Sequence, residues 1–115
     1  MSFRWPTKDP DETLDYSVDW SRYLGNAVIN DVVWFIQSKG YNTKTQIDSG
    51  ETFAVASGGS TTDTMQNISQ TNTNQVTTIN LGAGTNNEEY TFTCQIVDST
   101  GSTSERTIKL KVKER

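Results

Sequence analysis

The sequence predicts an all-β protein, an antiparallel β-sandwich of about seven to eight short strands. The 115 residues suit a single domain. Only 32% of them are hydrophobic, whereas Thr, Ser and Asn, which favour strands and turns, are frequent. Apolar and polar residues alternate over several short segments separated by turn signals, and no segment has a convincing helical period.

Residues 1–13 are predicted to form an extended N-terminal arm, and residues 14–115 the β-sandwich domain. The arm has a charged stretch without an apolar period, and its prolines disfavour helix before them. Phe3 and Trp5 need burial, either by folding back onto the domain or by docking on a neighbouring protein. We expect the arm to contact another chain and to be dispensable for folding. Phe3, Trp5 and Pro6 are therefore candidate interface residues.

Two strands are predicted next, over residues 14–20 and 27–37. The first alternates apolar and polar side chains without a break, and the second is rich in β-branched residues. Residues 21–26 between them are expected to form a turn, and the second strand is expected to kink at residues 30–31. Trp34 is the residue expected at the centre of the core.

The middle of the chain is the most polar part. Short strands are expected over residues 43–47 and 51–56. Residues 57–75 have only Met65 and Ile68 as apolar residues. They are interpreted either as a long loop or weak edge strand, or as a contact surface that orders on a partner. Under the second interpretation, Met65 and Ile68 are candidate interface residues.

The C-terminal part gives the clearest strand signals. A strand is expected over residues 76–81. Two alternating segments, residues 90–96 and 108–112, flank a glycine-containing turn at residues 98–101 and so predict a β-hairpin. The inward positions of these strands and of the two early strands make up the predicted core. It consists of Tyr16, Val18, Trp20, Trp34, Ile36, Tyr90, Phe92, Cys94, Ile96, Ile108, Leu110 and Val112.

No set of residues suited to catalysis stands out. The chain has no histidine, the commonest general base and metal ligand. Its single cysteine, Cys94, lies on an inward position between apolar neighbours and is interpreted as a core residue rather than a nucleophile. No phosphate-binding loop, nucleophile elbow or zinc spacing is present in the sequence. We therefore expect a protein without enzymatic activity, cofactor or metal.

Two groups of residues admit a binding interpretation. Carboxylates at Asp9, Asp11, Glu12 and Asp15 could bind calcium, but they lack the spacing and the glycine of an EF-hand loop. A solvated arm, or salt links from these carboxylates to Arg4, Arg22 or Arg106, is the favoured account. Trp5 could belong to a sugar-stacking surface, because the other two tryptophans lie at core positions.

Charge and hydropathy exclude several classes of partner. The net charge is −4 and the isoelectric point is near 4.6, so phosphate backbones are repelled. No apolar segment approaches the roughly 20 residues of a transmembrane helix, and the first residues lack the apolar stretch of a signal peptide. A single cysteine fits a protein assembled in a reducing compartment. We expect neither nucleic acid nor membrane as a partner.

One segment is more specific than the composition. Residues 7–21, T-K-D-P-D-E-T-L-D-Y-S-V-D-W-S, resemble the start of small bacteriophage Ig-like virion proteins of the fibre–tail adaptor type. The closing hairpin, with its D-S-T-G turn and Arg106, resembles the last two strands of Ig-like domains. Residues 43–80 show no comparable resemblance, and the specificity for a partner could reside there.

The resemblance implies an immunoglobulin-like antiparallel β-sandwich and a non-enzymatic virion structural protein. Such a protein would join tail fibres to the tail or baseplate, in several copies, and would contact other virion proteins. It would be located in the virion, after assembly in the cytoplasm of the bacterial host. A capsid decoration (cement) protein and a carbohydrate-binding β-sandwich module are the alternatives.

Overall fold

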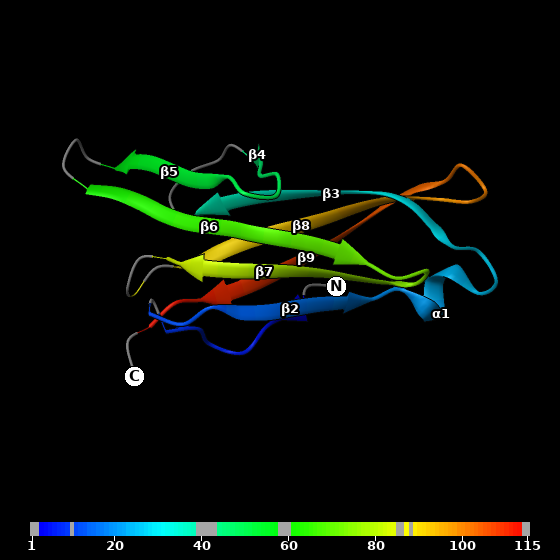
Figure 1. The fold of residues 1–115 in the computed structure, drawn as a ribbon, viewed down its shortest axis with the longest axis horizontal. Helices are drawn as coiled ribbons and strands as arrows, with labels where there is room; N and C mark the ends of the chain where they lie inside the picture. Colours follow the sequence, from blue (N-terminus) through cyan, green and yellow to red (C-terminus); the bar gives the residue numbers. More distant parts are fainter. Residues whose placement is uncertain are drawn as a thin grey trace.

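The computed structural model describes residues 3–9, 11–38, 44–57, 61–84, 87 and 89–113. This part of the chain contains nine strands and one helix of a single turn, and the strands form two stacked sheets (Figure 1). The predicted all-β sandwich is thereby confirmed. The elements are β1 (Phe3–Arg4), β2 (Leu14–Asp19), α1 (Ser21–Leu24), β3 (Ile29–Ser38), β4 (Thr45–Gln46), β5 (Thr52–Ser57), β6 (Thr61–Asn72), β7 (Val76–Ala83), β8 (Glu89–Asp98) and β9 (Thr103–Lys111).

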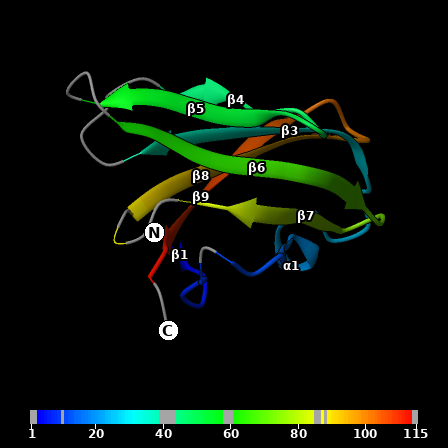
Figure 2. The same cartoon turned by 60° about the vertical axis from the view of Figure 1, so that its left-hand side comes forward.

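The order of the strands is immunoglobulin-like. One sheet has the order β1-β9-β8-β3-β4, and the other has the order β2-β7-β6-β5. The last two long strands therefore lie beside β3 in one sheet, while β2, β7 and β6 form the opposite sheet, as in the G-F-C and B-E-D strands of an immunoglobulin domain. Neighbouring strands are antiparallel except for β1 and β9, which are parallel. Figure 2 shows the two layers from a second direction.

The core lies between the two sheets. All twelve residues expected in it are buried, and none exposes more than 8% of its surface. Trp34 has no exposed surface and lies on β3, which pairs with β8 over nearly its whole length. Burial of so many large side chains is the main source of stability for a domain of this size. No helix in the described part of the chain has the length and apolar character needed to cross a membrane.

The segment between the first two long strands differs from its prediction. Residues 21–24 form a helical turn instead of a simple turn, in which the backbone N–H groups of Tyr23 and Leu24 both donate to the carbonyl of Trp20. Gly25 ends this turn with a φ of +58°, a conformation that favours glycine. The expected irregularity in the next strand is present, because the register with β8 shifts between Ile29 and Asp31.

The expectation of a long loop or weak edge strand after residue 57 is wrong. Residues 61–72 form β6, an interior strand that pairs with β5 on one side and β7 on the other. The alternation of apolar and polar residues did not reveal this strand, because the inward-facing Asn67 is polar and the outward-facing Ile68 is apolar. The side-chain amide of Asn67 donates to the carbonyl of Ile47 at 3.1 Å and to the side-chain oxygen of Gln70 at 3.0 Å. A bulge between Asn67 and Ser69 further breaks the alternation.

Candidate interaction surface

The N-terminal arm is part of the sandwich. Residues 3–9 run alongside β9, and β1 is the edge strand of its sheet. The backbone N–H of Trp5 donates to the carbonyl of Lys109 at 2.9 Å, and that of Lys8 donates to the carbonyl of Lys111 at 3.0 Å. The arm therefore extends the sheet by one strand.

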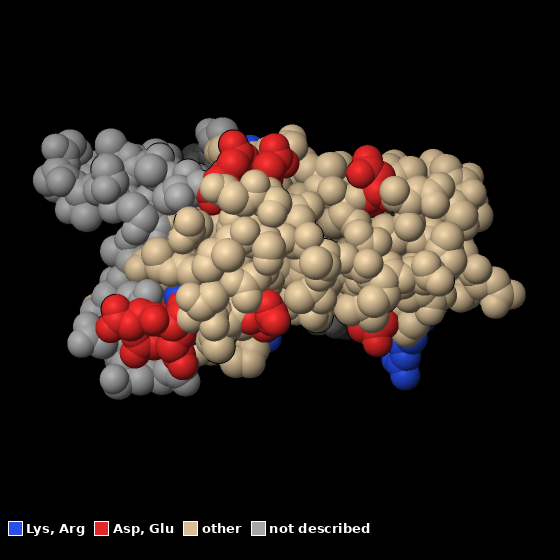
Figure 3. All heavy atoms as spheres, viewed as in Figure 1, with Lys and Arg blue, Asp and Glu red and all other residues tan. Residues whose placement is uncertain are grey.

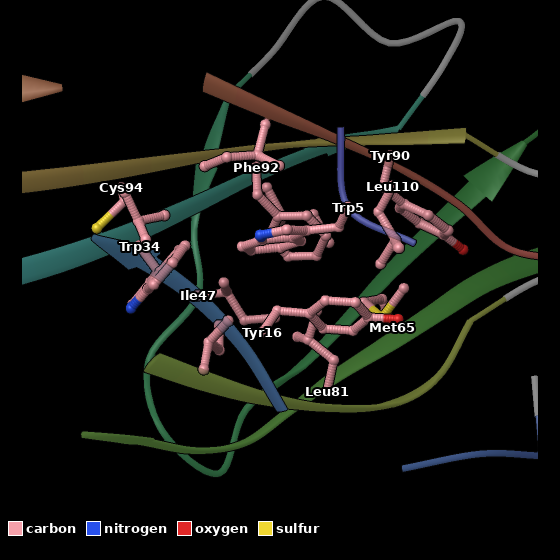
Figure 4. Close-up of a cluster of buried hydrophobic side chains, with 14 of the residues drawn as sticks. Trp5, Tyr16, Trp34, Ile47, Met65, Leu81, Tyr90, Phe92, Cys94 and Leu110 are labelled. Carbon is pink, nitrogen blue, oxygen red and sulfur yellow. The ribbon is translucent and has the colours of Figure 1, made fainter. Parts of the chain in front are cut away.

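The side chain of Trp5 closes the sandwich from its open edge. Its ring stacks on Tyr16 of the opposite sheet at 4.7 Å between centroids, and lies 5.5 Å from Phe92 and 5.9 Å from Trp34 (Figure 4). The indole N–H donates to the carbonyl of Ser17 at 3.2 Å, which ties the arm to the edge of β2. Only 9% of Trp5 is exposed. Of the two ways to bury this ring, folding back onto the domain is the one that occurs.

The five candidate interface residues divide into three groups. Trp5 and Met65 are buried in the core, so their assignment to an exposed interface is wrong; an apolar side chain gains more from a core position that it can reach. Pro6 and Ile68 are exposed and stay candidates. The side chain of Phe3 lies outside the described part of the structure. All three tryptophans are buried, so Trp5 is not available as a platform on which a sugar could stack.

Lys8 is a fully buried lysine that the sequence did not single out. Its ammonium group donates to the carbonyl of Ala83 at 2.6 Å and to the carbonyl of Asp9 at 2.9 Å. Burial lowers the pKa of Lys8, and the nearby carboxylates of Asp9 and Asp11 act in the opposite direction. The residue fastens the arm to the end of β7 in the other sheet.

The acidic residues after Lys8 cap a local turn. The carboxylate of Asp9 accepts a hydrogen bond from the backbone of Asp11 at 2.9 Å, and that of Glu12 accepts one from the backbone of Asp9 at 3.0 Å. Asp15 lies apart from them on β2, where it accepts a hydrogen bond from Asn80. Among the described residues, ion pairs join Arg4 to Glu89 and Lys44 to Glu105. Within those residues, no group of three or more His, Cys, Asp or Glu side chains is close enough to hold a metal ion.

A groove of about 460 Å³ opens where the edge of β2 meets β1 and β9. Its floor is apolar and its rim carries three arginines. We call it the arginine groove. It is lined by Arg4, Trp5, Ser17, Val18, Asp19, Arg22, Tyr23, Arg106 and Ile108.

Arg106 has the most unusual position in the arginine groove. It pairs in register with Cys94 and shares its phase with Ile108, so it occupies an inward position of β9. The guanidinium group lies over the ring of Trp20 at 5.1 Å and over the ring of Tyr23 at 5.8 Å. Aromatic faces attract such a cation, which explains how a charged side chain is held at the mouth of the core.

Tyr23 forms the outer wall of the groove. It is one of the two large hydrophobic residues with marked exposure in the described part of the chain, at 45%, and Ile68 is the other, at 39%. The helical turn α1 places its ring against Trp20, with 6.2 Å between the centroids, and its hydroxyl accepts a hydrogen bond from Ser104. These contacts hold the ring in place although nearly half of it faces solvent.

The matching family identifies the class of protein. Residues 8–67 match the family described as podophage GP4 fiber-tail adaptor protein gp77, and this segment is more than half of the chain. The chain belongs to this family of fibre–tail adaptors. The resemblance seen at residues 7–21 is confirmed. None of the curated proteins compared with the chain matches it.

The segment that matches the fibre–tail adaptor family covers the first half of the fold. It begins at the buried Lys8, includes the acidic turn, and ends in β6 at Asn67. It supplies Ser17, Val18, Asp19, Arg22 and Tyr23 to the arginine groove. The other lining residues are Arg4 of β1, the adjacent Trp5, and Arg106 and Ile108 of β9. The groove was not predicted from the sequence, although one signal was available. Arg106 lies on the same side of its strand as Ile108 and the inward apolar residues that follow it, which is an unusual position for a charged residue.

Proposed function

We propose that the protein joins tail fibres to the tail or baseplate of a podophage particle, as a non-enzymatic structural component. The observation that carries this proposal is the match of residues 8–67 to the fibre–tail adaptor family. Its partners would be fibre and tail subunits, and several copies would act together. The protein would reach the virion after assembly in the host cytoplasm.

The described structure fits a part that binds rather than reacts. Its cysteine is buried, and burial raises the pKa of the Cys94 thiol to about 12, so the thiolate needed for nucleophilic attack is scarce at neutral pH. The side chains of Trp5 and Lys8 fix the arm to the domain and close the core. The domain can therefore present its surface residues to a partner in fixed positions. Pro6 and Ile68 are exposed candidates for such contacts.

The adaptor role is better supported than the two alternatives. The matching family is named for the junction between fibre and tail, which does not favour a capsid decoration protein. The sugar-binding module depended on an exposed Trp5, and this residue is stacked on Tyr16 in the core.

The test is to assemble particles without this protein and to compare them with particles complemented by the intact chain. We expect particles lacking it to have filled heads and a tail but few or no attached fibres. A tag on the complementing chain should be found at the tail by electron microscopy. A tag distributed over the head, or a normal number of fibres without the protein, would contradict the proposal.

A further inference from the structure

We propose that the arginine groove binds a carboxylate-bearing segment of another virion protein. This inference rests on the proposed adaptor function and adds the chemistry of one partner. It is based on three features of the groove: its excess of positive charge, the position of Arg106 beside two aromatic rings, and its apolar floor.

The groove is a positive site on an acidic protein. The chain carries a net charge of −4, yet the groove gathers Arg4, Arg22 and Arg106 against the single carboxylate of Asp19. The carboxylate of Asp19 accepts a hydrogen bond from the backbone N–H of Ser21 at 2.9 Å. Figure 3 shows acidic side chains at several places on one face of the molecule and a basic side chain projecting at the end where α1 lies.

Two of the three arginines are available to a partner. Arg4 forms an ion pair with Glu89 at 3.1 Å. Within the described residues, no ion pair within 4 Å joins Arg22 or Arg106 to a carboxylate. Arg22 is exposed and Arg106 partly exposed, so both guanidinium groups can be reached from solvent.

The rings of Trp20 and Tyr23 hold the guanidinium group of Arg106 at the groove. The central carbon of the guanidinium group lies 5.1 Å from the ring centroid of Trp20 and 5.8 Å from that of Tyr23, and these two rings are inclined by 68° to each other. Arg106 lines the groove and is partly exposed, and a planar guanidinium group of this kind can bind a carboxylate through two parallel hydrogen bonds. A lysine at the same position would offer a point charge without this planar set of donors.

The floor of the groove indicates what accompanies the carboxylate. Trp5, Val18 and Ile108 line it with apolar atoms, and the exposed ring of Tyr23 forms its wall. A protein segment with an acidic residue next to an apolar one would complement both parts. A nucleic acid fits less well, because the net negative charge of this chain repels an extended polyanion.

The first experiment measures binding of a defined probe to the full chain by NMR. The probe is the capped peptide acetyl-Tyr-Glu-Glu-Glu-Glu-amide, and the control probe has lysine in place of glutamate. We expect the acidic peptide to shift the side-chain N–H signals of Arg22 and Arg106, with an affinity that falls as salt is raised from about 50 to about 300 mM. The same shifts with the lysine peptide, or no shifts at these arginines with the acidic one, would overturn the inference.

Charge reversal identifies the residues responsible. The double variant Arg22→Glu/Arg106→Glu should bind the acidic peptide at least about tenfold more weakly. Lys113→Glu makes the same change of charge at one exposed residue beyond the end of β9, roughly 20 Å along the chain from Arg106, and should bind as the wild type does. If the change at Arg106 prevents folding, the single variant Arg22→Glu is measured instead. Arg22 is exposed, so this variant should fold, and it should also bind the acidic peptide more weakly than the wild type. Equal affinity in the reversed and wild-type chains would refute the inference.

Particle assembly separates this inference from the proposed function. If the groove binds another virion protein, the double variant should enter particles at least about tenfold less well than Lys113→Glu. Normal incorporation of the double variant, together with loss of fibres when the whole protein is absent, would contradict the proposed binding of a virion protein in the groove. The same result would support the adaptor function. If the protein is found away from the tail, the adaptor function is contradicted. Binding of the acidic peptide then remains the test of whether the arginine groove binds carboxylates.

Sedimentation of the pure chain tests whether the occupant is a second copy. We expect the wild-type chain and the double variant to sediment alike at low salt. Self-association that is lost both in high salt and in Arg22→Glu/Arg106→Glu would show that the groove binds another copy of this chain, and would overturn the assignment to a different protein.

Discussion

The thiol of Cys94 lies in the centre of the sandwich, with no exposed surface. Its sulfur is 3.3 Å from the hydroxyl of Thr77, which in turn accepts a hydrogen bond from the indole of Trp20 at 3.1 Å. Burial raises the pKa of the Cys94 thiol from its ordinary value of 9.0 to about 12. The cysteine is therefore a neutral core residue over the physiological range of pH.

This pKa shift predicts a loss of stability at alkaline pH. Between pH 9 and pH 12 an unfolded chain has released the Cys94 proton while the folded chain keeps it. The free energy of unfolding therefore falls as pH rises, by at most about 1.4 kcal/mol per pH unit. Urea unfolding at pH 8, 9, 10 and 11 measures this slope.

The matched control is Cys94→Ala, which has no thiol to titrate. Burial also raises the pKa of Tyr16 to about 12, and this residue adds a slope of the same sign to both proteins. The difference between the two slopes therefore isolates the cysteine. Identical slopes above pH 9 would show that Cys94 ionises as readily in the folded chain as in the unfolded one.

Trp34→Ala should cost about 3–5 kcal/mol of unfolding free energy, because it removes a large ring from a fully buried position. Phe35 provides the control. It lies on the opposite face of β3, is partly exposed, and has Lys44 over its ring at 4.8 Å. Urea unfolding of Phe35→Ala should show a smaller loss. A cost below about 1 kcal/mol for Trp34→Ala would mean that the core does not depend on this ring.

At the scale of elements, the arm changes from an accessory segment to a structural strand. Deleting residues 1–13 removes β1, Trp5 and Lys8 together, so we expect the truncated chain to lose its cooperative unfolding transition. This replaces the expectation that the arm is dispensable for folding. The arm can still contact a partner through its exposed residues, but not through the ring of Trp5.

A point substitution tests the arm more selectively than the deletion. Trp5→Ala should destabilise the chain by about 3–5 kcal/mol, as expected for a large buried ring. Pro6→Ala, at the exposed neighbouring position, should change stability by about 0.5 kcal/mol or less. Thermal unfolding of the two variants gives the comparison. Equal stability of Trp5→Ala and the wild type would show that the arm does not dock in solution.

The sequence was informative where structure depends on neighbouring residues. The hairpin of β8 and β9 was predicted from alternation and from its turn, where Asp98 accepts hydrogen bonds from Thr100 and Ser102 and Gly101 has a φ of +88°. These signals are local. Strand β6 was missed because its pairing with β5 and β7, rather than its own composition, makes it a strand.

At the scale of the whole molecule, the candidate site could be predicted only in part. The motif at residues 7–21 identified the family, since its residues are contiguous. The arginine groove joins Arg4, Arg22 and Arg106 from distant parts of the chain. The pairing of β1 with β9 brings Arg4 near Arg106, and the packing of the two sheets brings Arg22 of α1 to the same edge. No sequence pattern specifies that parallel pairing, because it depends on how the arm folds back.

The parallel pairing of β1 with β9 has a mechanical consequence. Pulling the start of the arm and the end of β9 apart draws two strands past each other along their length. The hydrogen bonds from Trp5 to Lys109, from Lys8 to Lys111 and from Lys113 to Lys8 are then loaded in shear and share the force. An antiparallel hairpin pulled from its two free ends opens one bond at a time. Single-molecule stretching of the chain from its two ends should therefore show a distinct rupture peak, a property suited to a joint that carries tension.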